Sequence, residues 1–206
     1  METLRMLSFL LLFAMPALAF SQEEEHLEEA EDAVTTDEFS LPTPSAGKAI
    51  VIFTRPVLDA PIVQFKYFCN DIYLGKIGVG SYLVYECDPG KYLFWADSET
   101  INVVKAELAA DRVYIFDTFV QKGAFQARLT LTPFDPESKR ADRKRQSLIT
   151  QISKKTAKRF DPDEQPGKSL QRTANNVMKK YTVEPTEEDN KRWSKVTVMN
   201  ADQYIQ

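Results

Sequence analysis

The stretch LGKIGVGSYLVYECDPGKYLFWAD, from Leu74 to Asp97, decides how the fold of this 206-residue chain is interpreted. It holds a glycine-rich turn, an apolar segment from Tyr82 to Cys87, a Pro-Gly turn and a second apolar segment from Lys91 to Ala96. Proline fixes one backbone φ and glycine accepts a positive one, which suits the two central positions of a type II turn. The stretch therefore predicts two β-strands that pair as a hairpin around this turn.

Further segments rich in β-branched and aromatic residues lie on both sides of this stretch, with turn residues between them. They are Lys48–Arg55, Ile62–Cys69, Ile72–Ile77, Ile101–Leu108, Arg112–Val120 and Phe125–Leu131. Short strands that recur every eight to twelve residues or so are typical of an antiparallel β-sandwich. We expect one mainly β domain of this kind over residues 47–133.

Five motifs of this region resemble one family: FTRP (Phe53–Pro56), LGKI (Leu74–Ile77), GSY (Gly80–Tyr82), DPGKY (Asp88–Tyr92) and RVYIF (Arg112–Phe116). The family is an exported bacterial one, named only as domain of unknown function 2846, and the resemblance covers about residues 48–132. It implies a transthyretin-like or immunoglobulin-like sandwich in the cell envelope, and it implies no catalytic residue. The chain departs from the pattern at Thr54, where Tyr is common, and at Asp111, where Gly is usual. Many relatives are lipoproteins, whereas this chain lacks the cysteine that lipid attachment requires.

The first residues have the layout of a secretory signal peptide. Arg5 precedes an apolar run from Leu7 to Phe13, and Pro16 then leads into small residues. The apolar run is too short to span a bilayer comfortably. We predict cleavage near Ala19 or Ser21, within a signal region of residues 1–21, and a periplasmic or secreted mature protein with no transmembrane span. The alternative is a retained membrane anchor.

Residues 22–46 are acidic at first and then rich in Ser, Thr and Pro, which predicts a disordered spacer. The only histidine of the chain, His26, lies in this spacer. Mechanisms that need a histidine base in a packed pocket are therefore disfavoured.

The chain contains two cysteines, Cys69 and Cys87. An even pair in an exported protein is a disulfide candidate, and a bridge across this short loop would stabilise the fold by roughly 2–3 kcal/mol. The alternative is that both are buried free thiols that pack as small apolar residues. We expect the bridge.

The composition changes after Pro133, and we expect a charged helical extension over residues 135–206. Asp135-Pro136-Glu137 is a typical helix start, and helix-forming residues continue to about Arg159. A second helix is predicted from Lys168 to Tyr181, with one clear apolar face, and a third from Glu187 to Lys195, which carries Trp193. Isolated helices of this length are marginal, so their apolar stripes should pack on the sandwich, on each other or on a partner.

The first of these helices carries a run of positive charge that could contact an anionic surface. The residues are Lys139, Arg140, Arg143, Lys144, Arg145, Lys154, Lys155, Lys158 and Arg159. Anionic lipid headgroups are one possible target. Nucleic acid is disfavoured because the whole chain has a net charge of −4 and the basic run has no interleaved aromatic residues. The simpler interpretation is a solvated helix face that the acidic spacer partly neutralises.

The aromatic residues of the central stretch, Tyr82, Tyr85, Tyr92, Phe94 and Trp95, are candidates for a glycan- or peptide-binding surface. Strand alternation places Tyr82 and Val84 on one face and Leu83 and Tyr85 on the other, so about half of the set must face a core. We interpret the cluster as core.

No arrangement of residues in the sequence matches a metal site, a cofactor site or a nucleophile with its base, so we expect none of these. We expect a non-enzymatic envelope protein, in which a β-sandwich binds or scaffolds an envelope protein or an anionic envelope surface and the helical tail is a docking element. Two alternatives remain. One is an envelope enzyme that uses carboxylates in a pocket, and the other is a peripheral protein that binds an anionic membrane through the basic helix.

Overall fold

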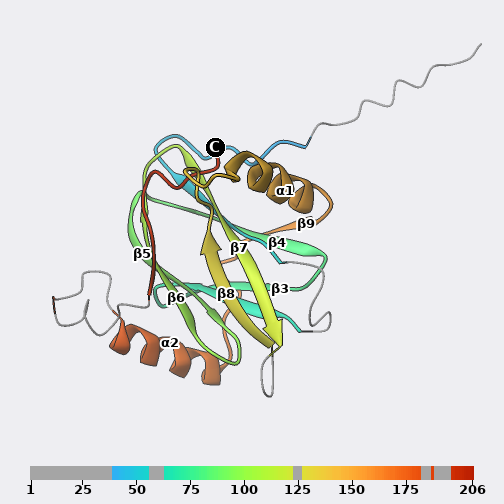
Figure 1. Ribbon diagram of the computed structural model, residues 1–206. Helices are drawn as coiled ribbons and strands as arrows, with labels where there is room; N and C mark the ends of the chain where they lie inside the picture. The colour runs from blue at the N-terminus through green and yellow to red at the C-terminus, as the bar shows by residue number, and fades with distance from the viewer. Residues whose placement is uncertain (1–38, 56–62, 123–126, 182–186, 188–195) are drawn as a thin grey trace, which may run out of the picture. The chain divides into compact units, whose positions relative to one another are not determined.

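The computed structural model describes residues 39–55, 63–122, 127–181, 187 and 196–206, all within one unit that runs from Glu38 to Gln206. Within these residues the chain is mainly β, and ten strands form two five-stranded sheets (Figure 1). Sheet A has the order β8 (Ala127–Pro133), β7 (Arg112–Lys122), β1 (Ala49–Phe53), β4 (Ser81–Cys87) and β9 (Thr156–Arg159). Sheet B has the order β10 (Thr197–Met199), β6 (Asn102–Leu108), β5 (Gly90–Asp97), β2 (Phe65–Cys69) and β3 (Ile72–Ile77).

The eight strands predicted between residues 47 and 133 are therefore confirmed, but the sheets are mixed rather than purely antiparallel. β1 pairs in parallel with β7, β4 with β9, and β6 with β10. The other strand pairs are antiparallel. The parallel pairs arise because strands far apart in the sequence meet side by side after the chain has crossed between the sheets.

The hairpin predicted around Pro89 and Gly90 is wrong. β4 belongs to sheet A, whereas β5 belongs to sheet B, so this turn carries the chain from one sheet to the other. The turn before β4 does the same, because β3 also lies in sheet B. β5 pairs with β2 on one side and β6 on the other, which leaves neither of its edges for β4. Gly90 has φ 150°, a backbone conformation that other residues rarely adopt. The prediction that this turn requires a glycine with positive φ is therefore confirmed.

The core between the sheets follows the predicted alternation. Phe65, Tyr67 and Cys69 of β2 point into it, as do Leu83 and Tyr85 of β4. Buried aromatic rings dominate this core; Phe53, for example, packs within 5.0–5.7 Å, centroid to centroid, of three other rings. Edge-to-face and offset ring contacts of this kind add to the stabilisation from burial.

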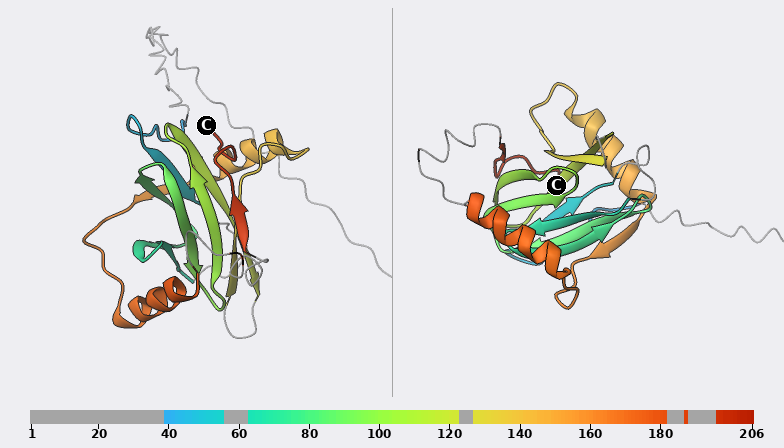
Figure 2. Two further views of the ribbon diagram at one scale, coloured as in Figure 1. Left: turned by 90° about the vertical axis from the view of Figure 1, so that its left-hand side faces the viewer. Right: turned by 90° about the horizontal axis from the view of Figure 1, so that it is seen from below.

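The opposite faces of both sheets are covered by helices. α1 (Ala141–Ser153) lies against sheet A, where its Leu148 and Ile152 join a buried cluster with residues of β1, β4 and β7. α2 (Lys168–Lys180) lies against sheet B, where Ala174 and Val177 pack on an aromatic layer formed by β2, β3 and β5. Figure 2 shows the two helices on opposite sides of the paired sheets. The apolar stripes of the extension therefore pack on the sandwich.

The extension is less helical than predicted. α1 ends at Ser153, and Thr156–Arg159 forms β9 because its backbone pairs with the exposed edge of β4. Residues 197–199 form β10, and the chain end pairs with β7, where Ile205 donates its N–H to the Val113 carbonyl and Val113 donates to the Gln206 carbonyl, both at 2.8 Å. The helix predicted over 187–195 lies outside the described residues except for position 187. Among the described residues, no helix is long and apolar enough to cross a bilayer.

The predicted disulfide is not supported. Cys69 lies on sheet B and Cys87 on sheet A, and both are buried free thiols. Facing sheets stand about 10 Å apart, whereas a disulfide requires Cα atoms about 4.4–6.8 Å apart. Burial raises the pKa of the Cys87 thiol to about 11 and raises the pKa of the Cys69 thiol as well. Both cysteines therefore pack as small apolar residues, which was the alternative considered.

Candidate functional site

The polar side of α1 results from the spacing of its buried residues. Leu148 and Ile152, one turn apart, face sheet A and are almost fully buried. Residues that follow the same helical period on the neighbouring face are polar or cationic; they are Arg143, Ser147, Thr150 and Lys154. Burial of the apolar stripe thus fixes the direction in which these four side chains leave the helix.

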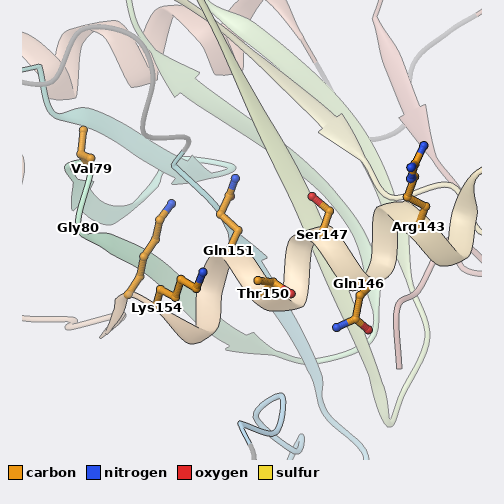
Figure 3. Close-up of a pocket in the computed structure, with 9 residues that line it drawn as sticks. Val79, Gly80, Arg143, Gln146, Ser147, Thr150, Gln151 and Lys154 are labelled. Carbon is orange, nitrogen blue, oxygen red and sulfur yellow. The ribbon is translucent and has the colours of Figure 1, made fainter.

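These four residues line a pocket of about 750 Å³ that is broadly open to solvent. The remaining lining residues are Val79, Gly80, Gln146, Gln151 and Lys155. Figure 3 shows the labelled side chains leaving α1, with the turn that contains Val79 and Gly80 beside the C-terminal end of the helix. We call this space the α1 pocket. Its volume lies in the range of small-molecule sites, about 300–1,000 Å³.

The turn between β3 and β4 forms one wall of the α1 pocket. Gly80 accepts a hydrogen bond at 3.0 Å from the backbone N–H of Thr156, the first residue of β9. This bond holds the turn next to Lys154 and Lys155, which immediately precede β9. The stretch that determines the path of the chain between the sheets therefore also contributes to the pocket.

Lys155 is the most unusual side chain of the pocket. Lys154 leaves the helix at φ −92° and ψ 7° and stays exposed, whereas Lys155 is partly buried. Its Nζ donates a hydrogen bond to the backbone carbonyl of Arg55. Desolvation, together with the positive charge of Arg55, lowers the pKa of Lys155 to about 8, and Asp117 opposes this shift.

Arg55, whose backbone carbonyl accepts this hydrogen bond, is 0% exposed, which is rare for a charged residue. Its guanidinium carbon lies 4.6 Å from the centroid of the Phe65 ring, and its Nη2 donates to the Val63 carbonyl at 3.3 Å. Beside it at the end of β1, the Thr54 hydroxyl donates to the Phe116 carbonyl at 3.2 Å and accepts from the Thr118 N–H at 3.3 Å. A buried polar layer therefore lies at the end of β1, where Lys155 contacts the backbone.

Gln151 supplies a second polar feature. Its Oε1 is buried, and it has no hydrogen-bond partner among the described residues. A buried amide oxygen without a partner costs free energy, so a ligand that donates a hydrogen bond at this position would remove that cost.

The remaining basic residues of the predicted run do not share this surface. Lys144 forms an ion pair with Asp117, and Lys158 with Glu164 at 2.8 Å. The guanidinium carbon of Arg145 lies 5.6 Å from the centroid of the Phe134 ring. Lys139, Arg140 and Arg159 are exposed, and Lys158 and Arg159 lie on β9 rather than on a helix. Of the nine basic residues, the structure brings only Arg143, Lys154 and Lys155 together in the α1 pocket.

The other candidate features are structural. Tyr82, Tyr85, Phe94 and Trp95 are buried and Tyr92 is partly buried, which confirms the core interpretation. The carboxylates near the end of β5 are paired: Asp97 with Lys66 at 3.3 Å and Glu99 with Arg128 at 3.0 Å. Among the described residues no group of three or more His, Cys, Asp or Glu side chains could hold a metal ion.

Sequence reasoning missed Arg55, Gln151 and the two turn residues of the pocket. Of these residues, Arg55 could have been noticed in the sequence, because a charged residue there directly follows a β-branched and aromatic segment and precedes a proline. Comparison of the chain with protein-family models, with curated proteins and with solved structures found no match.

Proposed function

We propose that this protein is an exported, non-enzymatic binding protein of the cell envelope, and that its α1 pocket holds a small molecule with an anionic group. One observation carries this proposal. Three cationic side chains, Arg143, Lys154 and Lys155, line one open pocket of about 750 Å³. Arg and Lys side chains form strong charge-assisted hydrogen bonds with carboxylates and phosphates.

The composition of the pocket favours binding over catalysis. Its described lining contains no carboxylate, histidine or cysteine, the groups that most often transfer protons or attack substrates. The buried polar and charged residues of the described chain are Thr54, Arg55 and Thr118, so a pair of buried carboxylates is not among them. These facts argue against the envelope enzyme that the sequence left open.

The same surface is poorly suited to lie in a membrane. A membrane-surface helix needs large apolar side chains beside its charges. The large hydrophobic residues that are exposed in the described chain are Val63, Ile72, Phe119 and Val198, and none of them belongs to α1. The apolar stripe of α1 is already buried on sheet A. A single anionic group in a pocket therefore fits the geometry better than a bilayer or a docked partner on this helix.

We also propose that the sandwich is of the transthyretin-like type. The first eight strands divide into the orders β8-β7-β1-β4 and β6-β5-β2-β3, with β1 parallel to β7, as such a sandwich requires. The proposed kinship with the exported family rests on motifs that occupy turns and core positions, such as Leu74 and Ile77, which are buried. Export itself rests on the N-terminal sequence pattern.

Calorimetric titration with pyridoxine 5′-phosphate tests the proposed function, because this probe joins a phosphate to a ring small enough for the pocket. Pyridoxine, which lacks the phosphate, is the matched control. We expect the phosphate ester to bind at least tenfold more tightly, and its affinity to fall as salt is added. Equal affinity for the two compounds, or no binding of either, would contradict the proposal.

A further inference from the structure

We propose that the outer edge of β9 binds an extended, acidic segment of a partner protein, which adds to sheet A as one more strand. This inference goes beyond the proposed function and does not depend on it, because no residue of β9 belongs to the described lining of the α1 pocket. It assigns an interaction surface and the chemistry of the segment that fits it.

The pairing of β9 with β4 uses only every second residue of β9. The N–H groups of Thr156 and Phe160 donate to backbone carbonyls in or next to β4, at 3.0 and 3.1 Å. Successive residues of a strand direct their backbone groups to opposite sides, so the N–H and C=O groups of Ala157 and Arg159 point away from β4. Within the described part of the chain β9 is the last strand of sheet A, so no strand there pairs with these four groups.

The opposite edge of sheet A, at β8, is closed by comparison. The Leu129 N–H donates to the Ser98 hydroxyl at 3.3 Å, and the Leu131 N–H donates to Asn102 Oδ1 at 2.8 Å. Side chains from sheet B and its turn thus occupy donors that a further strand would need. An edge without such protection pairs readily with another strand. Of the two edges of sheet A, β9 is therefore the one that can accept a partner.

The charges beside β9 select the kind of segment. Lys154, which precedes the strand, and Arg159, at its end, are exposed and form no ion pair with another described residue. A second copy of β9 would bring the same cations together, and like charges on paired strands are destabilising. An acidic segment would neutralise them. The charge therefore favours an acidic partner over a second copy of this chain.

A short segment is sufficient for this contact. When a strand is added to a sheet edge, its backbone hydrogen bonds provide affinity and its side chains provide specificity. Five extended residues cover the four residues of β9, so an acidic residue at each end of the segment can approach Lys154 and Arg159. We expect a reversible, salt-sensitive interaction, because the contact is small and its charges are exposed.

The test probe is a fluorescein-labelled, amidated peptide of sequence Glu-Val-Thr-Val-Glu, because valine and threonine favour an extended backbone. Fluorescence anisotropy with the full chain measures its affinity. One control peptide has lysine in place of both glutamates. A second control is N-methylated at the threonine and at the next valine, which removes a donor from either edge of the peptide. Both controls should bind at least tenfold more weakly.

A variant of the protein tests the same contact from the other side. Ala157→Pro removes one outward N–H and leaves the N–H groups that pair with β4, so it should weaken peptide binding at least tenfold. Ala157→Ser keeps the N–H and should bind within twofold of the unchanged protein. Circular dichroism checks that both variants are folded.

Amide hydrogen exchange, followed by NMR, locates the peptide on the unchanged protein. Bound peptide should slow exchange at Ala157 and Arg159, whose N–H groups it would accept. Exchange at Leu129 and Leu131 should stay the same, because their N–H groups are already bonded. Slower exchange on β8 without any change on β9 would place the contact on the wrong edge and overturn the inference.

The remaining outcomes are equally decisive. Undiminished binding of the N-methylated peptide would exclude strand addition, and undiminished binding of the lysine peptide would exclude an acidic partner. If the chain alone sediments as a dimer that Ala157→Pro dissociates, a second copy occupies the edge and the inference is wrong. Failure of every peptide to bind would also overturn it. None of these results affects the proposed function, which titration with pyridoxine 5′-phosphate tests separately.

Discussion

The two helices of the extension have the same length of 13 residues and cover equivalent faces of the two sheets, yet they differ in what they leave exposed. α2 lies on a continuous aromatic layer, in which Phe68 stacks on Trp95 at 3.9 Å between ring centroids. The hollow beside it, about 490 Å³, is lined by one lysine, Lys179, and one carboxylate, Asp71. The described lining of the hollow beside α1 contains three cationic side chains and no anionic one.

The comparison shows that the two helices of the extension have the same packing role but differ in the charge of the pocket beside them. Both helices bury two residues almost fully, Leu148 and Ile152 on α1 and Ala174 and Val177 on α2. Both therefore contribute to stability by covering a sheet. Only α1 combines this role with three cationic side chains in the described lining of a pocket, so only α1 should affect the binding of an anion.

The largest expected effect concerns packing. Ile152→Ala should lower the free energy of unfolding by about 2–5 kcal/mol, because Ile152 is fully buried between α1 and sheet A. Val177→Ala removes less buried volume from α2 and should cost about 1–2 kcal/mol. Urea unfolding followed by circular dichroism measures both. A change of less than 0.5 kcal/mol or so in Ile152→Ala would mean that α1 is not packed on sheet A in solution.

The second effect concerns charge. Replacing both Arg143 and Lys154 with Gln should weaken the binding of pyridoxine 5′-phosphate at least tenfold, because each loses a charge-assisted hydrogen bond. The matched pair on α2, Lys179→Gln with Lys180→Gln, removes the same charge from the other helix and should leave the affinity within twofold. Similar losses in both double variants would show that binding follows net charge alone, which would contradict a specific α1 pocket.

A smaller effect concerns pH and stability. Because the folded pKa of Lys155 lies below its unfolded value of 10.5, the unfolded chain binds more protons between about pH 8 and pH 10.5, and stability rises with pH in that window. We expect the free energy of unfolding of the wild type, relative to Lys155→Met, to increase by about 1 kcal/mol between pH 7 and pH 10, a value reduced for solvent screening. A constant difference would indicate that Lys155 titrates normally.

The smallest expected effect is on membranes. Pelleting with liposomes of phosphatidylglycerol should retain little more protein than liposomes of phosphatidylcholine, because α1 exposes no large apolar side chain. Strong, salt-sensitive binding to the anionic liposomes alone would favour the membrane-surface alternative over a small-molecule pocket.

The strands could be predicted from the sequence because their faces are encoded locally. The alternation of Phe65, Tyr67 and Cys69 indicated which residues of β2 point into the core, and the structure places all three there. The path between the sheets could not be predicted from the same pattern. A turn such as Pro89-Gly90 joins two strands equally well within a sheet or between sheets, and the choice depends on which distant strands take up each edge.

β9 and the α1 pocket could not be predicted from the sequence for a related reason. The segment Thr156–Arg159 has no marked strand preference, and it becomes a strand only because the edge of β4 is available to it. Basic residues in one run looked equivalent in the sequence, but the end of α1 at Ser153 sends Lys155 toward Arg55 and leaves Lys154 exposed. Arg55 lies 100 positions earlier in the chain than Lys155, so no local pattern links them.

The position of a bound anion tests the central claim most directly. Backbone amide NMR spectra of the full chain, recorded during titration with pyridoxine 5′-phosphate, locate the site residue by residue. The α1 pocket predicts the largest shifts at Val79, Gly80, Ser147 and Thr150, which line it, with little change at Asn175 and Met178 beside α2. Shifts centred on α2, or spread evenly over both helices, would contradict the assignment of the binding site to α1.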